Sequence, residues 1–139
     1  MSRRTERESV FKLLFRREFN SEEEMPEQIR LFFEDTEETG KLNDEAKASV
    51  EAKYNSVVNK IEEIDEIISG KSEGWSISRM GKVDLTLIRL AVYEIKFDDT
   101  IPDLVAVNEA VEIAKRYGGD SSPSFVNGIL AKVVPKSEN

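Results

Sequence analysis

The sequence has 139 residues, contains no cysteine and no histidine, and carries a formal net charge of −8. A chain of this length forms one domain, or at most two small lobes. The missing residue types exclude disulfides, thiol nucleophiles, imidazole bases and ordinary zinc sites, which removes most familiar catalytic constellations. We expect no catalytic residues, metal or cofactor. No apolar run approaches the roughly 18 residues of a membrane span, and the start lacks an apolar signal segment. We therefore expect a cytoplasmic protein that does not bind a membrane.

The basic charge is concentrated at the amino terminus. Residues 1–17 carry a net +4, residues 18–73 a net −11 and residues 74–139 a net −1. An acidic chain is usually a poor ligand for nucleic acid, because a polyanion is bound by clustered Lys and Arg. Because residues 1–17 are basic, this segment is still a candidate for binding nucleic acid.

The apolar spacing predicts helices in the first half of the chain. A first helix follows the amino-terminal arginines, with one buried face and one arginine-lined face; its apolar residues are Val10, Phe11, Leu14, Phe15 and Phe19. Pro26 suits the first turn of a second helix, which closes near Gly40. Asn43 is predicted to cap a long helix that Gly70 ends.

The second half is also predicted to be helical. Residues 71–74 are predicted to be a linker, and the segment from Val83 to Ile95 is apolar nearly all round, which is typical of a central helix buried on most sides. A further helix runs from about Val105 to Tyr117-Gly118-Gly119. We expect an all-α protein of about seven helices in two helical subdomains, residues 1–70 and 71–139.

The stretch "SPSFVNGILAKVV" contains Asn127-Gly128, a strong hairpin signal. Its flanking apolar residues recur at helical spacing, and Ser122 as cap with Pro123 at the first position predicts a helix instead. A glycine inside a helix costs roughly 1 kcal/mol relative to alanine. We therefore expect another helix to approach closely at Gly128.

Three motifs in the second half carry a family resemblance. They are "GKVDLTLIRLAVYEI", "IPDLVAVNEAVEIAKRYGG" and "SFVNGILAKV", and in this order and spacing they resemble the NusB family of bacterial transcription antitermination factors. The resemblance implies an all-helical protein without enzymatic activity. It also implies binding of the single-stranded boxA element in nascent ribosomal RNA transcripts, as a heterodimer with NusE, a small-subunit ribosomal protein. Other Nus factors and RNA polymerase are then indirect partners.

Carried over by position, the resemblance implies RNA contacts at Arg3, Arg4, Arg7 and Phe125. The chemistry agrees, because unpaired bases stack on aromatic or guanidinium planes and arginine holds phosphate. The alternatives are that Phe125 belongs to the core and that the arginine arm is only solvated. Ser124 stands where the family often has a basic residue, which removes one expected phosphate contact.

The same resemblance places NusE against the carboxy-terminal subdomain. Asp84 falls where an acidic contact residue is common in the family. The alternative is a solvated aspartate in the first turn of a helix, where the helix dipole favours a negative charge.

Two other classes of function compete with an RNA-binding transcription factor. One is a helical protein-binding scaffold that leaves the arginine arm unused. The other is an RNA cytosine methyltransferase, some of which begin with a NusB-like domain. Such an enzyme needs a catalytic cysteine, and this sequence has none.

Overall fold

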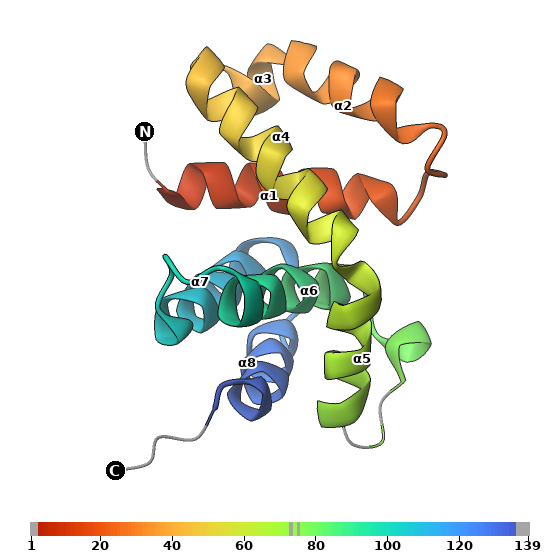
Figure 1. Ribbon diagram of the computed structural model, residues 1–139, viewed down its shortest axis with the longest axis vertical. Coiled ribbons are helices and arrows are strands. Elements are labelled where there is room, and N and C mark those ends of the chain that lie inside the picture. The colour runs from red at the N-terminus through yellow and green to blue at the C-terminus, as the bar shows by residue number, and fades with distance from the viewer. Residues whose placement is uncertain (1–2, 73, 75, 136–139) are drawn as a thin grey trace. The chain divides into compact units, whose positions relative to one another are not determined.

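The computed structural model describes residues 3–72, 74 and 76–135, and every regular element in them is helical (Figure 1). The prediction of an all-α protein is confirmed. The α-helices are α1 (Arg3–Arg17), α2 (Met25–Glu34), α3 (Thr36–Thr39), α4 (Asp44–Asn59), α5 (Ile61–Lys71), α6 (Lys82–Phe97), α7 (Asp103–Tyr117) and α8 (Ser122–Val133). A short 3-10 helix, η1 (Ile77–Arg79), precedes α6. Within the described ranges, no helix is long and apolar enough to cross a membrane.

The contacts divide the chain into two compact units, Met1–Val58 and Asn59–Asn139. The sequence predicts a boundary after residue 70 instead, in a linker of which Glu73 lies outside the described residues. The helix α5 belongs with the second unit because it packs on α6 and α8.

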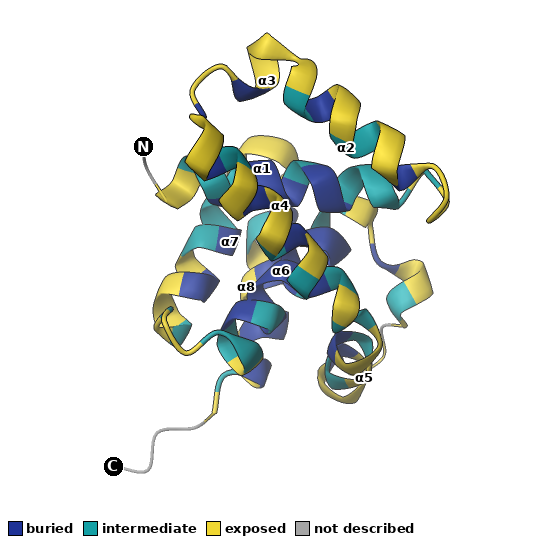
Figure 2. Cartoon of the chain, turned by 45° about the horizontal axis from the view of Figure 1, so that its top comes forward, coloured by how far each residue is buried: buried dark blue, intermediate teal, exposed yellow. Residues whose placement is uncertain are grey.

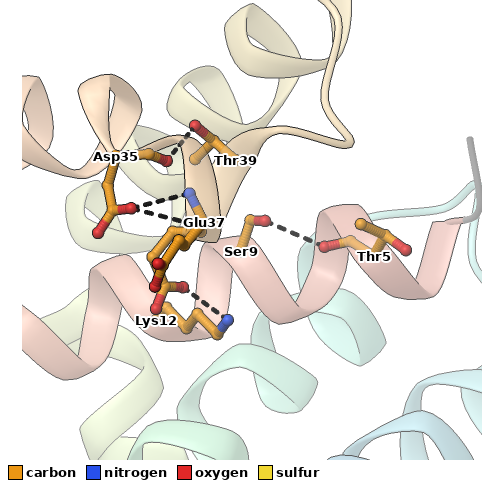
Figure 3. Close-up of polar contacts among 7 residues, drawn as sticks. Thr5, Ser9, Lys12, Asp35, Glu37 and Thr39 are labelled. Carbon is orange, nitrogen blue, oxygen red and sulfur yellow. Dashed lines mark hydrogen bonds and ion pairs between the residues drawn. The ribbon is translucent and has the colours of Figure 1, made fainter.

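In the first unit, α2 packs on α1 and on α3. The helix α1 contributes Val10, Phe11, Leu13 and Leu14 to the buried core, while α2 buries only Met25 and Phe32 (Figure 2). Pro26 lies in the first turn of α2, as the sequence predicted. The second helix ends earlier than expected, at Glu34, because Asp35 leaves the helical conformation and its carboxylate caps α3 by accepting from the N–H groups of Glu37 and Glu38 (Figure 3).

The long helix expected from Asn43 to Gly70 is two helices. Asn43 caps α4 as predicted, because its Oδ1 accepts from the Ala46 N–H at 2.8 Å. The backbone of Lys60, at φ −109° and ψ 7°, departs from the helical conformation, and α5 starts after it. The helical spacing of buried apolar residues continues across the break, because Val57 on α4 and Ile64 on α5 are both fully buried. The periodicity predicted the buried face correctly but did not show the break in the backbone.

In the second unit, α6 contacts α5, α7 and α8, and α7 also packs on α8. The prediction that α6 is a central helix is confirmed: its buried residues include Leu85, Leu87, Ile88, Leu90, Ala91 and Val92. Arg89 on α6 donates to both carboxylate oxygens of Asp65 on α5, at 2.9 Å each. This two-pronged ion pair ties α5 to the central helix.

The turn between α7 and α8 is tightly packed. The helix α7 ends at Tyr117, as predicted, and Gly118 follows it. A Cβ on Gly118 would lie 2.5 Å from the Cβ and Oγ of Ser122 and 3.0 Å from the carbonyl oxygen of Ala114. Ser122 is the first residue of α8 rather than its cap, and its Oγ accepts from the Gly119 N–H at 3.1 Å. Only a glycine fits at position 118 without displacing Ser122.

Candidate nucleic-acid interface

The amino-terminal arginines do not form a loose arm. Arg3 and Arg4 are exposed, but they already form the first turn of α1. Arg7 is one turn further on and is only 6% exposed, so the expectation that it lies in an exposed arm was wrong. The reason is helical spacing: position 7 lies on the same face as Val10, Phe11 and Leu14, which follow it at i+3, i+4 and i+7.

Two further basic residues of α1 are engaged within the first unit. The Nζ of Lys12 lies 2.7 Å from a carboxylate oxygen of Glu38 on α3 (Figure 3). The guanidinium of Arg16 donates to the side-chain oxygen of Gln28 at 3.2 Å and lies over the ring of Phe32. The basic charge of this segment is therefore partly used to hold α2 and α3, and Arg3 and Arg4 are its exposed start.

Phe125 lies in the first half of α8 and is half-buried. The core positions of this helix are its neighbours Val126, Ile129, Leu130 and Val133, all of them buried. One side of Phe125 is thus supported by the fold, while part of its surface is accessible. Phe125 is therefore less buried than the core positions of the same helix.

Asn127 and Gly128 lie inside α8, so the prediction of a helix across the Asn-Gly pair is confirmed. The expectation of a close helix at Gly128 was wrong. Gly128 is exposed, and a Cβ built on it meets no heavy atom within 4 Å. The apolar residues of α8 lie on the opposite side of the helix, so the neighbouring helices pack there and leave Gly128 open.

Asp84 lies in the first turn of α6 and is half-buried. Its Oδ1 is buried and has no hydrogen-bond partner among the described residues. A carboxylate oxygen normally finds a donor when it is removed from water. The helix dipole at this position favours the charge but does not supply a donor to that oxygen.

The predicted site residues belong to both units. Arg3 and Arg4 are neighbours in the first unit, whereas Phe125 and Asp84 lie in the second unit on α8 and α6, two helices that contact each other.

In the described part of the chain, no group of three or more acidic residues is arranged to hold a metal ion. The sequence predicted correctly that Asn127 and Gly128 lie inside a helix, but it did not predict that both are exposed. Apolar spacing shows which face of a helix is buried, but not whether another element covers the opposite face.

These features define a small all-helical protein, with exposed arginines on one unit and a partly exposed aromatic residue on the other. The model of the NusB family matches residues 4–135. The transcription antitermination protein NusB of Lachnoclostridium phytofermentans is 48% identical over 134 residues, covering 96% of this chain and 99% of the relative. The NusB protein of Agathobacter rectalis is 49% identical over 132 residues, covering 95% and 98%. The chain belongs to the NusB family.

Solved structures agree with this assignment. T. maritima NusB superposes with a TM-score of 0.79 at 36% identity, covering 96% of this chain and 90% of the other. A crystal structure of the antitermination factors NusB and NusE in complex with dsRNA matches with a TM-score of 0.77 at 28% identity, covering 94% of each chain. The family is one of transcription antitermination factors, which are regulators rather than enzymes.

Proposed function

We propose that this protein is a transcription antitermination factor that binds single-stranded boxA RNA of nascent ribosomal RNA transcripts together with NusE, in the cytoplasm. Other Nus factors and RNA polymerase are then partners through this complex. The proposal is supported by membership of the NusB family and by the likeness to a NusB that was crystallised with NusE and RNA.

The observation that carries RNA binding is the partial exposure of Phe125 on a helix whose other large apolar residues are buried. Part of the Phe125 side chain lies against the fold, and part of its surface remains accessible. An unpaired base can stack on such a surface, whichever base it is. The exposed Asn127 adds an amide two residues further along α8 that can donate to and accept from a base edge or a ribose.

Arg3 and Arg4 supply the electrostatic part of the proposal. Both are exposed at the start of α1, where a guanidinium can hold a phosphate through two parallel hydrogen bonds. Arg7 is assigned a different role, because its buried guanidinium is held inside the fold. In this proposal it positions the first turn of α1 and with it the two exposed arginines.

Asp84 is the proposed contact to NusE. Its buried Oδ1 lacks a donor within the described residues, and a Lys, Arg or hydroxyl group of a partner protein would provide one. A hydrogen bond to a charged group contributes roughly 1.5 to 3 kcal/mol. We therefore expect Asp84→Ala to weaken NusE binding about tenfold or more.

The decisive experiment is a titration of fluorescently labelled boxA RNA with the protein, in the presence and absence of NusE, beside a scrambled RNA of equal length. Specific binding that strengthens with NusE supports the proposal. NusE binding without any preference for boxA would instead show a protein-binding scaffold. The Asp84→Ala variant is measured against NusE without RNA, so that the partner contact is tested separately.

A further inference from the structure

Gly128 has no explanation inside the fold. It occupies the seventh of the twelve positions of α8, and glycine at an interior position weakens a helix relative to alanine. Its backbone is not in the left-handed region, since Gly74 is the only described residue with a positive φ. An added Cβ would meet no atom within 4 Å. Neither backbone conformation nor internal packing requires a glycine here.

The position of Gly128 points to an external reason. It follows Phe125 by three residues and Ser124 by four, so it is a helix-surface neighbour of each of them. Ser124, Asn127 and Gly128 are all exposed. The glycine therefore lies next to the ring that we propose as a stacking platform.

We propose that Gly128 is an RNA contact, at which the ribose-phosphate backbone next to the base stacked on Phe125 lies directly against the bare backbone of α8. The inference rests on the proposed function and adds a contact residue to it. A helix carbonyl that already accepts one helical hydrogen bond keeps a second lone pair, and the 2′-hydroxyl of a ribose can donate to it. A Cβ at position 128 would hold the ribose away from this surface.

The test uses substitutions at position 128 that should stabilise the fold but weaken RNA binding. Gly128→Ala removes a helix-weakening residue without a clash, so the urea midpoint should rise. The same variant should bind boxA RNA in the presence of NusE about tenfold more weakly, which corresponds to about 1.4 kcal/mol. Gly128→Leu keeps good helix propensity with a larger side chain, and its RNA affinity should fall further.

Gly70 provides a matched control. It is also an exposed glycine inside an α-helix, near the end of α5, and a Cβ on it likewise meets nothing within 4 Å. Gly70→Ala should raise the urea midpoint and leave RNA binding unchanged. NusE affinity measured without RNA should be the same for the parent and both alanine variants.

The outcomes separate this inference from the proposed function. If the parent protein binds boxA RNA and Gly128→Ala binds it equally well, Gly128 is not a contact, although the proposed function stands. A loss of NusE affinity with unchanged RNA affinity would assign Gly128 to the protein partner and overturn the inference. If the parent shows no preference for boxA at all, both proposals fail together.

Discussion

The α7–α8 region contains two glycines, Gly118 and Gly128, whose surroundings are opposite. In the turn between α7 and α8, Gly118 is a glycine because Ser122 and the Ala114 carbonyl occupy the space of a Cβ. On the exposed side of α8, Gly128 has open space where its Cβ would be. Two large side chains of α8 differ in the same way, because Leu130 is buried in the core and Phe125 is only half-buried.

The contrast shows that residue type alone does not separate a structural position from a binding position. A glycine in a helical segment suggests a close approach, and the sequence predicted one at Gly128. The close approach occurs ten residues earlier, in the turn. A residue that costs helix stability and gains nothing inside the fold is a candidate for a role outside it.

The largest effect is expected from truncating a side chain on the buried side of α8. Leu130→Ala should lower the free energy of unfolding by roughly 2 to 5 kcal/mol, because Leu130 is 0% exposed and its removal leaves a cavity. Phe125→Ala should cost clearly less, since part of that ring is already in contact with water. Urea unfolding of the two variants checks this, and equal losses would return Phe125 to the core.

A smaller loss of folding stability is expected from a substitution in the turn between α7 and α8. Gly118→Ala should destabilise the protein by roughly 1 to 3 kcal/mol, because its Cβ would lie 2.5 Å from the Cβ of Ser122 and force the start of α8 to shift. The double variant with Ser122→Gly removes the obstructing side chain, so the two changes should not be additive. Additive losses in urea would mean that Ser122 is not the obstacle.

The exposed side of α8 is tested by RNA binding rather than by folding. Phe125→Ala should lose roughly 1 to 3 kcal/mol of boxA affinity, the usual contribution of one stacked base. The dependence of affinity on salt should hardly change, because stacking releases no counterions. Unchanged affinity in a folded variant would remove Phe125 from the site.

The smallest effect on folding is expected at the start of α1, where the same contrast recurs between exposed and buried arginines. Replacing Arg3 and Arg4 by Ala should change stability by less than about 0.5 kcal/mol, because both are exposed. The slope of log affinity against log salt should flatten by about 0.7 for each phosphate that the variant no longer binds.

Arg7→Ala is the matched comparison for the exposed pair. Because Arg7 is buried, its loss should appear first in urea unfolding. A variant at position 7 that keeps full stability and loses RNA affinity would contradict the structural role assigned to this residue. A double variant at positions 3 and 4 that binds RNA with an unchanged salt slope would remove α1 from the interface.

Local pattern determined much of this protein. The i, i+4 spacing predicted the helical class and most buried faces, Asn43 and Pro26 indicated two helix starts, and the apolar flanks correctly outweighed the Asn-Gly hairpin signal. Such features depend on residues within one or two turns of each other, so the sequence contains them directly. The three motifs of the second half also indicated the family.

Tertiary structure alone decided the break at Lys60, the burial of Arg7, the ion pair of Arg89 with Asp65 and the open space around Gly128. Spacing shows which residues share a face, but not which residues from elsewhere in the chain lie opposite that face. Asp65, a partner of Arg89, is 24 positions away in the sequence. Whether Gly128 is covered depends on where α6 and α7 pack around α8, and that is settled only when the helices assemble.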